Sequence, residues 1–207
     1  MVELLERYPS LEICKNDIMS AADLLVDTYK KGGKLLLCGN GGSCADCDHI
    51  SGELLKGFLK KRSIPQDVRA SMINACPDLK GETLDFLQCG LPAISLPSLT
   101  ALMSAYANDC DPNLIYAQGV LAMGKPGDVL IAISTSGNSK NVIYASQVAK
   151  ATGVKVVALT GGDGGELKNY SDICIAVPEK ETFKVQELHL PVYHFICKYI
   201  EESFFKK

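Results

Sequence analysis

His49 and Glu53 are four residues apart in a segment that follows a glycine-rich turn. On a helix, this spacing places both side chains on one face, about one turn apart. An imidazole and a carboxylate in that arrangement are the groups that general acid–base catalysis uses. They are also two of the ligand types that zinc accepts in proteins. The pair therefore predicts either proton transfer or metal binding on one side of a helix.

A second set of such groups lies near the C-terminus, in the segment VQELHLPVYHF. Gln186 and His194 are eight residues apart, about 80° out of alignment on a helix, so both can border the same cleft. With His49 and Glu53 they provide two imidazoles, a carboxylate and an amide. This set suits an acid–base array beside a carbonyl group, or a divalent metal such as zinc. We expect the intervening His189 to be structural.

Two glycine-containing loops carry side chains that suit a phosphate group. The first, GNGGS, contains Asn40, Gly41, Gly42 and Ser43, and the second is STSGNS at residues 134–139. Glycine permits a close approach of the main chain, and hydroxyl groups can donate to phosphate oxygens. Either loop alone is equally well explained as a strand-to-helix turn with capping residues. The occurrence of both favours a site for one phosphate monoester.

A parallel sheet is the element predicted to hold these loops. Short runs that are apolar on both faces begin near residues 34, 92, 128, 154 and 173, and helical stretches are expected at 43–60, 98–108, 138–151 and 182–203. Strands of this kind are typical of a parallel sheet covered by helices. The pattern predicts an α/β fold with a doubly wound, five-stranded parallel sheet in three layers, similar to flavodoxin. Ligands bind beyond the carboxyl ends of such strands.

The remaining segments are predicted to belong to the same single domain, residues 1–207. Residues 1–31 carry apolar positions at helical spacing and are expected to form an N-terminal helical extension. Residues 63–91 mix turn residues with weak helical periodicity, so we expect an insertion there. The sequence contains no repeat, low-complexity tract or interdomain linker.

Composition argues against several classes of protein. The 207 residues carry a net charge of −3, and the main basic stretch is KGFLKKR at 56–62, which argues against a nucleic-acid partner. The chain has no run apolar enough to span a membrane, and its N-terminus lacks the pattern of a signal peptide. Nine cysteines, several inside predicted strands and helices, favour a reducing compartment over a disulfide framework. We therefore expect a cytoplasmic protein.

Two other kinds of site are less well supported. Gly39, Gly41 and Cys44 form an incomplete version of the dinucleotide-binding fingerprint. However, no acidic residue ends the next predicted strand, and neither glycine loop has the lysine of a phosphate-binding loop. Cys44 and Cys47 form a CxxC pair, which raises the possibility of a redox or metal site. A single pair inside a predicted helix is better explained by packing.

Four segments together resemble the sugar isomerase (SIS) domain family, and within it the sedoheptulose 7-phosphate isomerases, also called phosphoheptose isomerases. In chain order they are CGNGGSCADCDHISGEL, AND at 107–109, GKPGDVLIAISTSGNSKNVIYA and VQELHLPVYH, and they extend over most of the chain. The resemblance implies an intramolecular aldose–ketose isomerase that acts through an enediol. It also implies that the reaction converts sedoheptulose 7-phosphate to a heptose 7-phosphate.

The resemblance further implies roles for individual residues. Glu53 and His194 are implied as the acid–base groups, with Glu53 as the base that removes the proton beside the carbonyl. A zinc site, described for some members, is implied at His49, Glu53, Gln186 and His194. The implied contacts of the sugar phosphate are Asn40, Gly41, Gly42, Ser43, Asn108, Asp109, Ser134, Thr135, Ser136, Ser139 and Gln186.

The resemblance also implies a homotetramer in which N-terminal helices pack between subunits and active sites lie at the interfaces.

Two features depart from the family pattern. Ser98 and Leu99 stand where the family has a threonine–aspartate pair, and residues 66–92 have no clear counterpart. The identity of the sugar phosphate is therefore open. The alternative function is a non-catalytic one, because some members bind sugar phosphates as regulators and another binds a bacterial replication initiator.

Overall fold

Five short apolar segments form strands because both of their faces are covered by helices. The computed structural model describes residues 1–205, so the last two residues of the predicted domain lie outside it. All five strands are parallel, in the order β2-β1-β3-β4-β5. Their bounds are Leu35–Gly39 for β1, Ala93–Ser95 for β2, Val129–Ile133 for β3, Lys155–Gly161 for β4 and Ile173–Val177 for β5. The predicted doubly wound, five-stranded sheet is confirmed.

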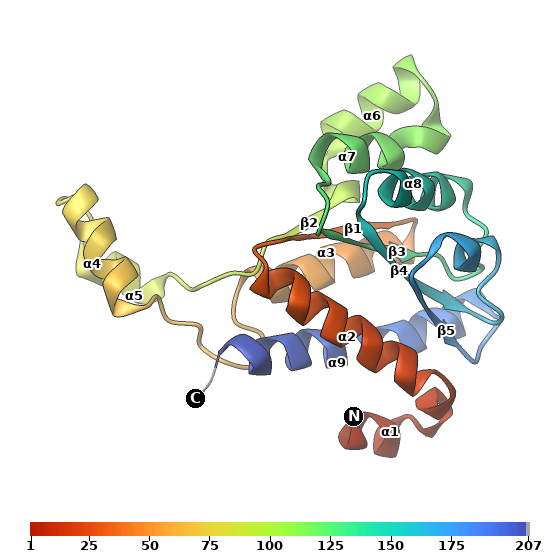
Figure 1. Cartoon of the computed structure of the whole chain (residues 1–207), viewed down its shortest axis with the longest axis horizontal. Helices are drawn as coiled ribbons and strands as arrows, with labels where there is room; N and C mark the ends of the chain where they lie inside the picture. Colours follow the sequence, from red (N-terminus) through yellow and green to blue (C-terminus); the bar gives the residue numbers. More distant parts are fainter. Residues whose placement is uncertain (206–207) are drawn as a thin grey trace.

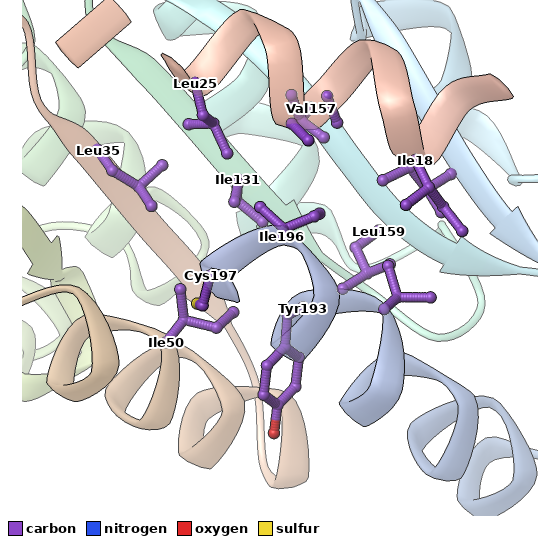
Figure 2. Packing of buried hydrophobic residues seen from close by; sticks show 14 of the residues in the cluster. Ile18, Leu25, Leu35, Ile50, Ile131, Val157, Leu159, Tyr193, Ile196 and Cys197 are labelled. Atoms are coloured by element: carbon purple, nitrogen blue, oxygen red, sulfur yellow. The ribbon is translucent and has the colours of Figure 1, made fainter. Parts of the chain in front are cut away.

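Helices cover the sheet on both faces and give the three-layer arrangement (Figure 1). Helices α2 (Lys15–Lys30), α3 (Gly42–Leu55) and α9 (Thr182–Phe204) pack on one face, and α7 (Ile115–Met123) and α8 (Lys140–Ala151) pack on the other. Successive strand residues point to opposite faces, so Leu35 and Leu37 join the first core while Leu36 and Cys38 join the second. Figure 2 shows the first core, where α2, α3 and α9 meet the strands.

The remaining helices and 3₁₀ helices lie outside these two groups. They are α1 (Val2–Arg7), η1 (Pro9–Cys14), α4 (Gln66–Ala75), α5 (Gly81–Phe86), η2 (Leu96–Ser98), α6 (Thr100–Asp109), η3 (Pro112–Leu114) and η4 (Glu166–Tyr170).

Two helices differ from their predicted extents. The helix predicted at 43–60 ends at Leu55, because the following segment turns around a buried carboxylate instead of continuing the helix. Glu201 accepts the backbone N–H groups of residues 58, 59 and 60 and the Nε–H of Arg62, at 2.8–3.1 Å. Helix α7 was not predicted, because its segment is apolar without clear periodicity and contains Gly119.

Helix α2 of the N-terminal extension has two faces with different surroundings. Ile18, Ala21 and Leu25 of α2 are fully buried in the first core of the same chain. The buried face of α2 therefore belongs to the core of its own chain, while Asp17, Asp23 and Asp27 on its other face are exposed. The predicted contacts of residues 1–31 between subunits stay a prediction.

Residues 63–91 form an arm that stands away from the sheet and carries α4 and α5 (Figure 1). The arm leaves the body at an isolated antiparallel bridge between Ser63 and Gln88. Within α4 no residue is buried, and Leu84 is the buried residue of α5. Phe86 at the end of α5 is 87% exposed. The segment therefore extends from the domain and does not cover a face of the sheet.

Within residues 1–205, no helix is both long enough and apolar enough to cross a lipid bilayer. The cytoplasmic location drawn from composition stays a prediction.

Candidate active site

The chain changes direction at the carboxyl ends of β1 and β3, because the helices that follow these strands go to opposite faces. The two strands are neighbours, and Gly39 at the end of β1 pairs with Ile133 at the end of β3. The chain then enters α3 on one face and α8 on the other. Ligands of open parallel sheets bind at such a change of direction, where helix N-termini present free N–H groups to anions. Both predicted phosphate loops lie there.

The first loop is fixed by side chains from the second half of the chain. Asn40 and Asn141 exchange two amide hydrogen bonds, each 2.9 Å long, which tie the first loop to the start of α8. The Tyr116 hydroxyl donates to the carbonyl oxygen of Gly39 at 2.6 Å. Gly41 has a φ of 56°, a conformation that favours glycine. The loop is therefore held in one shape before any ligand binds.

The second loop packs against the glycine-rich connection after β4. Ser134 donates to the Ser139 hydroxyl at 3.0 Å inside the loop. Gly137 accepts the backbone N–H of Leu167 at 2.9 Å, and a side chain at Gly137 would overlap the carbonyl oxygen of Gly164. The segment TGGDGGEL, at residues 160–167, thus supports the second loop from behind.

Three of the predicted chemical groups meet where α3 and α9 lie side by side. The Nε2 atom of His49 is 3.3 Å from Oε1 of Glu53 and 3.5 Å from Nε2 of His194. The two imidazole rings meet edge to face, with 5.0 Å between their centroids. The side chain of Glu53 is 16% exposed and that of His49 is 42% exposed, so the carboxylate is the more shielded group. We call His49, Glu53 and His194 the helix-pair cluster.

Two further residues, which the sequence analysis missed, hold His49 from behind. Nδ1 of His49 lies 3.1 Å from the Tyr193 hydroxyl, and this hydroxyl donates to Oδ1 of Asp46 at 3.1 Å. A signal for Asp46 was present, because Asp46 and His49 are three residues apart and so share a helix face with Glu53. Tyr193 gave no such signal, since its contact depends on how α9 packs on α3.

Gln186 lies at the other end of the same helix pair. Gly42, the first residue of α3, is in such close contact with the Gln186 amide that a side chain at Gly42 would overlap it. His49 and His194 follow seven and eight residues later on the two helices, roughly 10–12 Å further along at the rise of an α-helix. Helices α3 and α9 therefore run parallel, with the phosphate loop at one end of their shared face and the helix-pair cluster at the other.

Burial sets the electrostatics of this face. The pKa of His194 is lowered, first by burial and then by the nearby His49, while Glu53 acts in the opposite direction. Burial likewise raises the pKa of Asp46, against the hydrogen bond from Tyr193 and the influence of His49. A lowered pKa favours the neutral imidazole of His194, which can accept or relay a proton.

The helix-pair cluster partly fits a zinc ion. Its donor types suit zinc, and the separations of 3.3 and 3.5 Å around His49 Nε2 match the roughly 3.4 Å between ligand atoms in a tetrahedral site with bonds of about 2.1 Å. Within residues 1–205, however, no three His, Cys, Asp or Glu side chains already form a closed metal-binding group. The cluster has the chemistry and two of the spacings of a zinc site.

Several predicted contact residues lie apart from this face or use their polar atoms elsewhere. Asn108 and Asp109, at the end of α6, are exposed, and Asn108 donates to Asp109 at 2.9 Å; neither side chain bonds to a glycine loop within the described chain. The Thr135 carbonyl oxygen accepts from the N–H of Gly161. Ser43 is buried beneath the first loop. The predicted roles of these residues stay predictions.

Ser98, one of the two residues after β2 that depart from the family pattern, makes a side-chain hydrogen bond. Ser98 in η2 donates a hydrogen bond to Asp48 of α3, and both residues are exposed at the surface. Asp48 lies next to His49 in the sequence. The Ser98 hydroxyl is thus linked to the helix that carries His49 and Glu53, while Leu99 contributes no polar group.

The environment of the CxxC pair disfavours redox chemistry. Burial raises the pKa of both Cys44 and Cys47, and nearby acidic residues raise it further. Reactive cysteines instead have lowered pKa values that favour the thiolate. Cys47 is fully buried within the first core, so the packing interpretation is the better one.

Comparison with known proteins places this geometry among sugar phosphate enzymes. Two models of the SIS domain match the chain, one at residues 99–196 and the other at residues 3–79. Together they include both glycine loops and the helix-pair cluster.

Similar sequences carry one name. The chain is 37% identical over 190 residues to the phosphoheptose isomerase of Roseiflexus sp. strain RS-1, which covers 92% of this chain and 83% of the relative. It is 38% identical over 205 residues to the phosphoheptose isomerase of Helicobacter pylori strain Shi470. This match covers 99% of this chain and 92% of the relative.

Solved structures give the same result for the fold. The phosphoheptose isomerase of Neisseria gonorrhoeae superimposes with a TM-score of 0.76 at 31% identity, covering 97% of this chain and 94% of the other. That of Francisella tularensis gives a TM-score of 0.78 at 31% identity, covering 95% and 91%.

Proposed function

The chain belongs to the SIS domain family, in its phosphoheptose isomerase group, and on that premise we propose that it is an aldose–ketose isomerase that converts sedoheptulose 7-phosphate to a heptose 7-phosphate. Relatives and solved structures of that name match nearly the whole chain.

One observation carries the proposal: the phosphate loop and the helix-pair cluster lie at opposite ends of one face of α3 and α9. Gly42 and Gln186 mark the loop end, and His49 and His194 mark the other. This separation suits an extended sugar phosphate whose phosphate group lies at one end and whose carbonyl lies at the other. A phosphate bound at the loops would therefore place the reacting carbons beside Glu53.

We assign the phosphate to a position between the two loops. The N-termini of α3 and α8 lie on either side of this position, and a dianion is stabilised at helix N-termini. Ser134, Ser136 and Ser139 add hydroxyl donors from the second loop. The Asn40–Asn141 amide pair keeps the loops at a fixed separation. Binding energy from this end of the substrate would position the reactive end.

The chemistry requires one proton to move between adjacent carbons. Glu53 would remove the proton from the carbon beside the carbonyl, giving an enediol, and would return it to the neighbouring carbon. Its side chain is 16% exposed and so is more shielded than that of His49, which limits competition from water. His194, whose pKa is lowered by burial, would move the second proton between the two oxygens. The reaction consumes no other reactant.

We further propose that the helix-pair cluster binds zinc; the predicted fourth ligand, Gln186, lies against Gly42 in this structure and its side chain would have to turn toward the cluster to complete the set. Support comes from the donor types and from the two separations around His49 Nε2. A bound zinc ion would polarise the carbonyl and hydroxyl oxygens of the sugar. The Gln186 amide lies against Gly42, so it can equally serve the substrate.

The subunits are proposed to form a homotetramer with the active sites near interfaces. A groove of about 770 Å³ lies between α1 and α9 and includes His194 among its lining residues. Its walls are largely apolar, with Leu4, Phe58 and Phe195 among them. Light scattering would test this proposal: removal of residues 1–8 should release smaller species and retain the core that α2 completes. A monomeric full-length protein would contradict it.

A coupled assay with sedoheptulose 7-phosphate and a panel of shorter ketose phosphates tests the proposed activity. We expect turnover of sedoheptulose 7-phosphate and no turnover of sedoheptulose itself. Turnover of a different ketose phosphate would change the substrate and keep the reaction. Binding of sugar phosphates without turnover of any of them would instead support the non-catalytic alternative.

A further inference from the structure

Tyr193 occupies an unusual position between the apolar core and the helix-pair cluster. Its ring belongs to the first core and is 2% exposed as a residue. Figure 2 shows the hydroxyl of Tyr193 pointing away from the other labelled side chains, toward the space beside α3. This polar end finds two partners there, Asp46 and His49. None of the proposed catalytic steps uses Tyr193 or Asp46.

The directions of these two hydrogen bonds depend on each other. An ionised carboxylate can only accept, so Asp46 must receive the hydroxyl proton of Tyr193. The Tyr193 oxygen then has no proton left for His49 and can only accept from it. The atom that faces this oxygen is Nδ1 of His49, at 3.1 Å. The contact between Nδ1 and the Tyr193 oxygen therefore requires a proton on Nδ1.

We infer that Tyr193, held by Asp46, is a positioning residue that keeps His49 protonated at Nδ1 and thereby turns the lone pair of His49 Nε2 toward Glu53 and His194. The inference deepens the proposed active site and rests on that function for its purpose. Its evidence is the chain of contacts from Asp46 to His49 and does not depend on the reaction.

The opposite tautomer would change what the helix-pair cluster can do. A proton on Nε2 of His49 would donate to Oε1 of Glu53, 3.3 Å away, and would occupy the carboxylate that is proposed as the base. It would also remove the lone pair that a metal ion needs. Residues that fix a ligand's tautomer from behind typically change metal affinity or activity by about 10–100-fold.

The surroundings of Asp46 favour the proposed direction. Oδ2 of Asp46 is buried without a hydrogen-bond partner in the described chain, so a proton on that atom would find no acceptor. A proton on Oδ1 would have to displace the one that Tyr193 donates. The hydrogen bond from Tyr193 to Oδ1 therefore favours the ionised carboxylate, against burial, which raises the pKa of Asp46.

The tautomers can be read directly by nitrogen NMR of the metal-free protein labelled with ¹⁵N-histidine. The chain has only three histidines, which are assigned by removing each in turn. His189 is an internal reference of the opposite kind, because its Nε2 donates to the Thr160 carbonyl oxygen at 3.2 Å and its Nδ1 has no partner among the described residues. At neutral pH we expect His49 protonated at Nδ1 and His189 protonated at Nε2.

The test variant is Tyr193→Phe, which keeps the ring in the core and removes the hydroxyl. We expect the His49 signals to move to the Nε2-protonated form or to an average of both forms, with the His189 signals unchanged. Asp46→Ala should move the His49 signals in the same direction, which covers a failure of Tyr193→Phe to fold. Tyr29→Phe is the matched control, since it removes a buried hydroxyl that donates to the Pro92 carbonyl oxygen far from His49.

Two results would overturn the inference: Nε2-protonated His49 in the wild type, or His49 signals that are the same in wild type and Tyr193→Phe. Zinc titration against a competing chelator adds a second readout, with affinity expected to be about 10–100-fold weaker in Tyr193→Phe. Equal affinities would contradict the orienting role. The NMR spectrum reports the His49 tautomer even if the protein turns over no sugar. A failure of this inference can therefore be told apart from a failure of the proposed function.

Discussion

The two ends of the face shared by α3 and α9 are built from different kinds of chemical group. At the phosphate end, the groups are mostly main-chain N–H groups and small side chains on loops that follow adjacent strands. At the other end, the helix-pair cluster is made of long side chains from two helices, positioned by Tyr193 and Asp46. The first end depends on the sheet, and the second depends on helix packing.

This difference separates binding from chemistry. Main-chain donors at a helix N-terminus attract a phosphate whatever lies at the far end of the ligand. Proton transfer instead requires side chains within hydrogen-bond distance of the reacting carbons. We therefore expect changes in the glycine loops to weaken binding, and changes in the helix-pair cluster to abolish turnover while binding persists.

The largest expected effect comes from Glu53→Gln. The amide keeps the volume of the side chain but cannot accept a proton, so turnover should fall by about 10²–10⁴-fold. Binding of sugar phosphate, measured by calorimetry, should change little. Glu12→Gln is the control, because Glu12 pairs with Lys15 on the surface, in η1. Unchanged turnover in Glu53→Gln would remove the carboxylate from the base role.

His189 should show an effect on stability alone, although it lies on the same helix as His194. Burial lowers its pKa from 6.5 to about 4, so the native state stays unprotonated where the unfolded state takes up a proton. The contribution of His189 to the free energy of unfolding is therefore complete above pH 6.5. It is lost as the pH falls toward 4, by an amount on the order of 3 kcal/mol.

The His189→Gln variant isolates this contribution, since glutamine can still donate to Thr160 but does not titrate. Urea unfolding at pH 7.5 and pH 5 should show a smaller loss of stability for the variant than for the wild type. An equal loss in both proteins would contradict the assignment.

Gly42→Ala tests the end of the face where Gln186 meets the first loop. An added methyl group would overlap the Gln186 amide, which must move away. Because the amide is the flexible end of its side chain, we expect little loss of stability and a weakening of sugar phosphate binding by about 1.5 kcal/mol, the upper range for one hydrogen bond, with a smaller change in kcat. Gly52→Ala on the same helix is the matched control, because the added methyl group meets nothing within 4 Å. Identical binding in the two variants would mean that this contact is unimportant.

The smallest effects are expected from the serine loop. Removal of one hydroxyl, in Ser136→Ala or Ser139→Ala, should weaken binding of the sugar phosphate by about 0.5–1.5 kcal/mol. Binding of the unphosphorylated sugar should be unaffected. Ser171→Ala is the control, because Ser171 lies before β5 at the opposite end of the sheet and donates to the Lys168 carbonyl oxygen. A loss that is equal for both ligands would place the phosphate elsewhere.

The same contrast explains how much the sequence could predict. The five strands and both glycine loops were readable because each strand and loop is a local pattern of apolar residues and turn residues. The pairing of His49 with Glu53 was readable from helical spacing, and the segment with Gln186 and His194 from its residue types.

The features that were missed depend on contacts between distant segments. The end of α3 at Leu55 is set by Glu201, which lies more than 140 residues further along the chain. The role of α2 in the core could not be separated from an oligomeric role, because an apolar stripe looks the same in both cases. Tyr193 was also missed, since its position only has meaning once α9 lies against α3.

Incubation of the wild-type enzyme with sedoheptulose 7-phosphate in deuterated water tests the central claim most directly. If Glu53 passes a proton between adjacent carbons through an enediol, that proton can exchange with solvent while Glu53 holds it, so part of the aldose product should carry deuterium on the carbon next to its carbonyl. Glu53→Gln should bind the substrate and give no labelled product. Product formed by the wild type without any solvent deuterium, or labelled product from Glu53→Gln at the wild-type rate, would contradict the account.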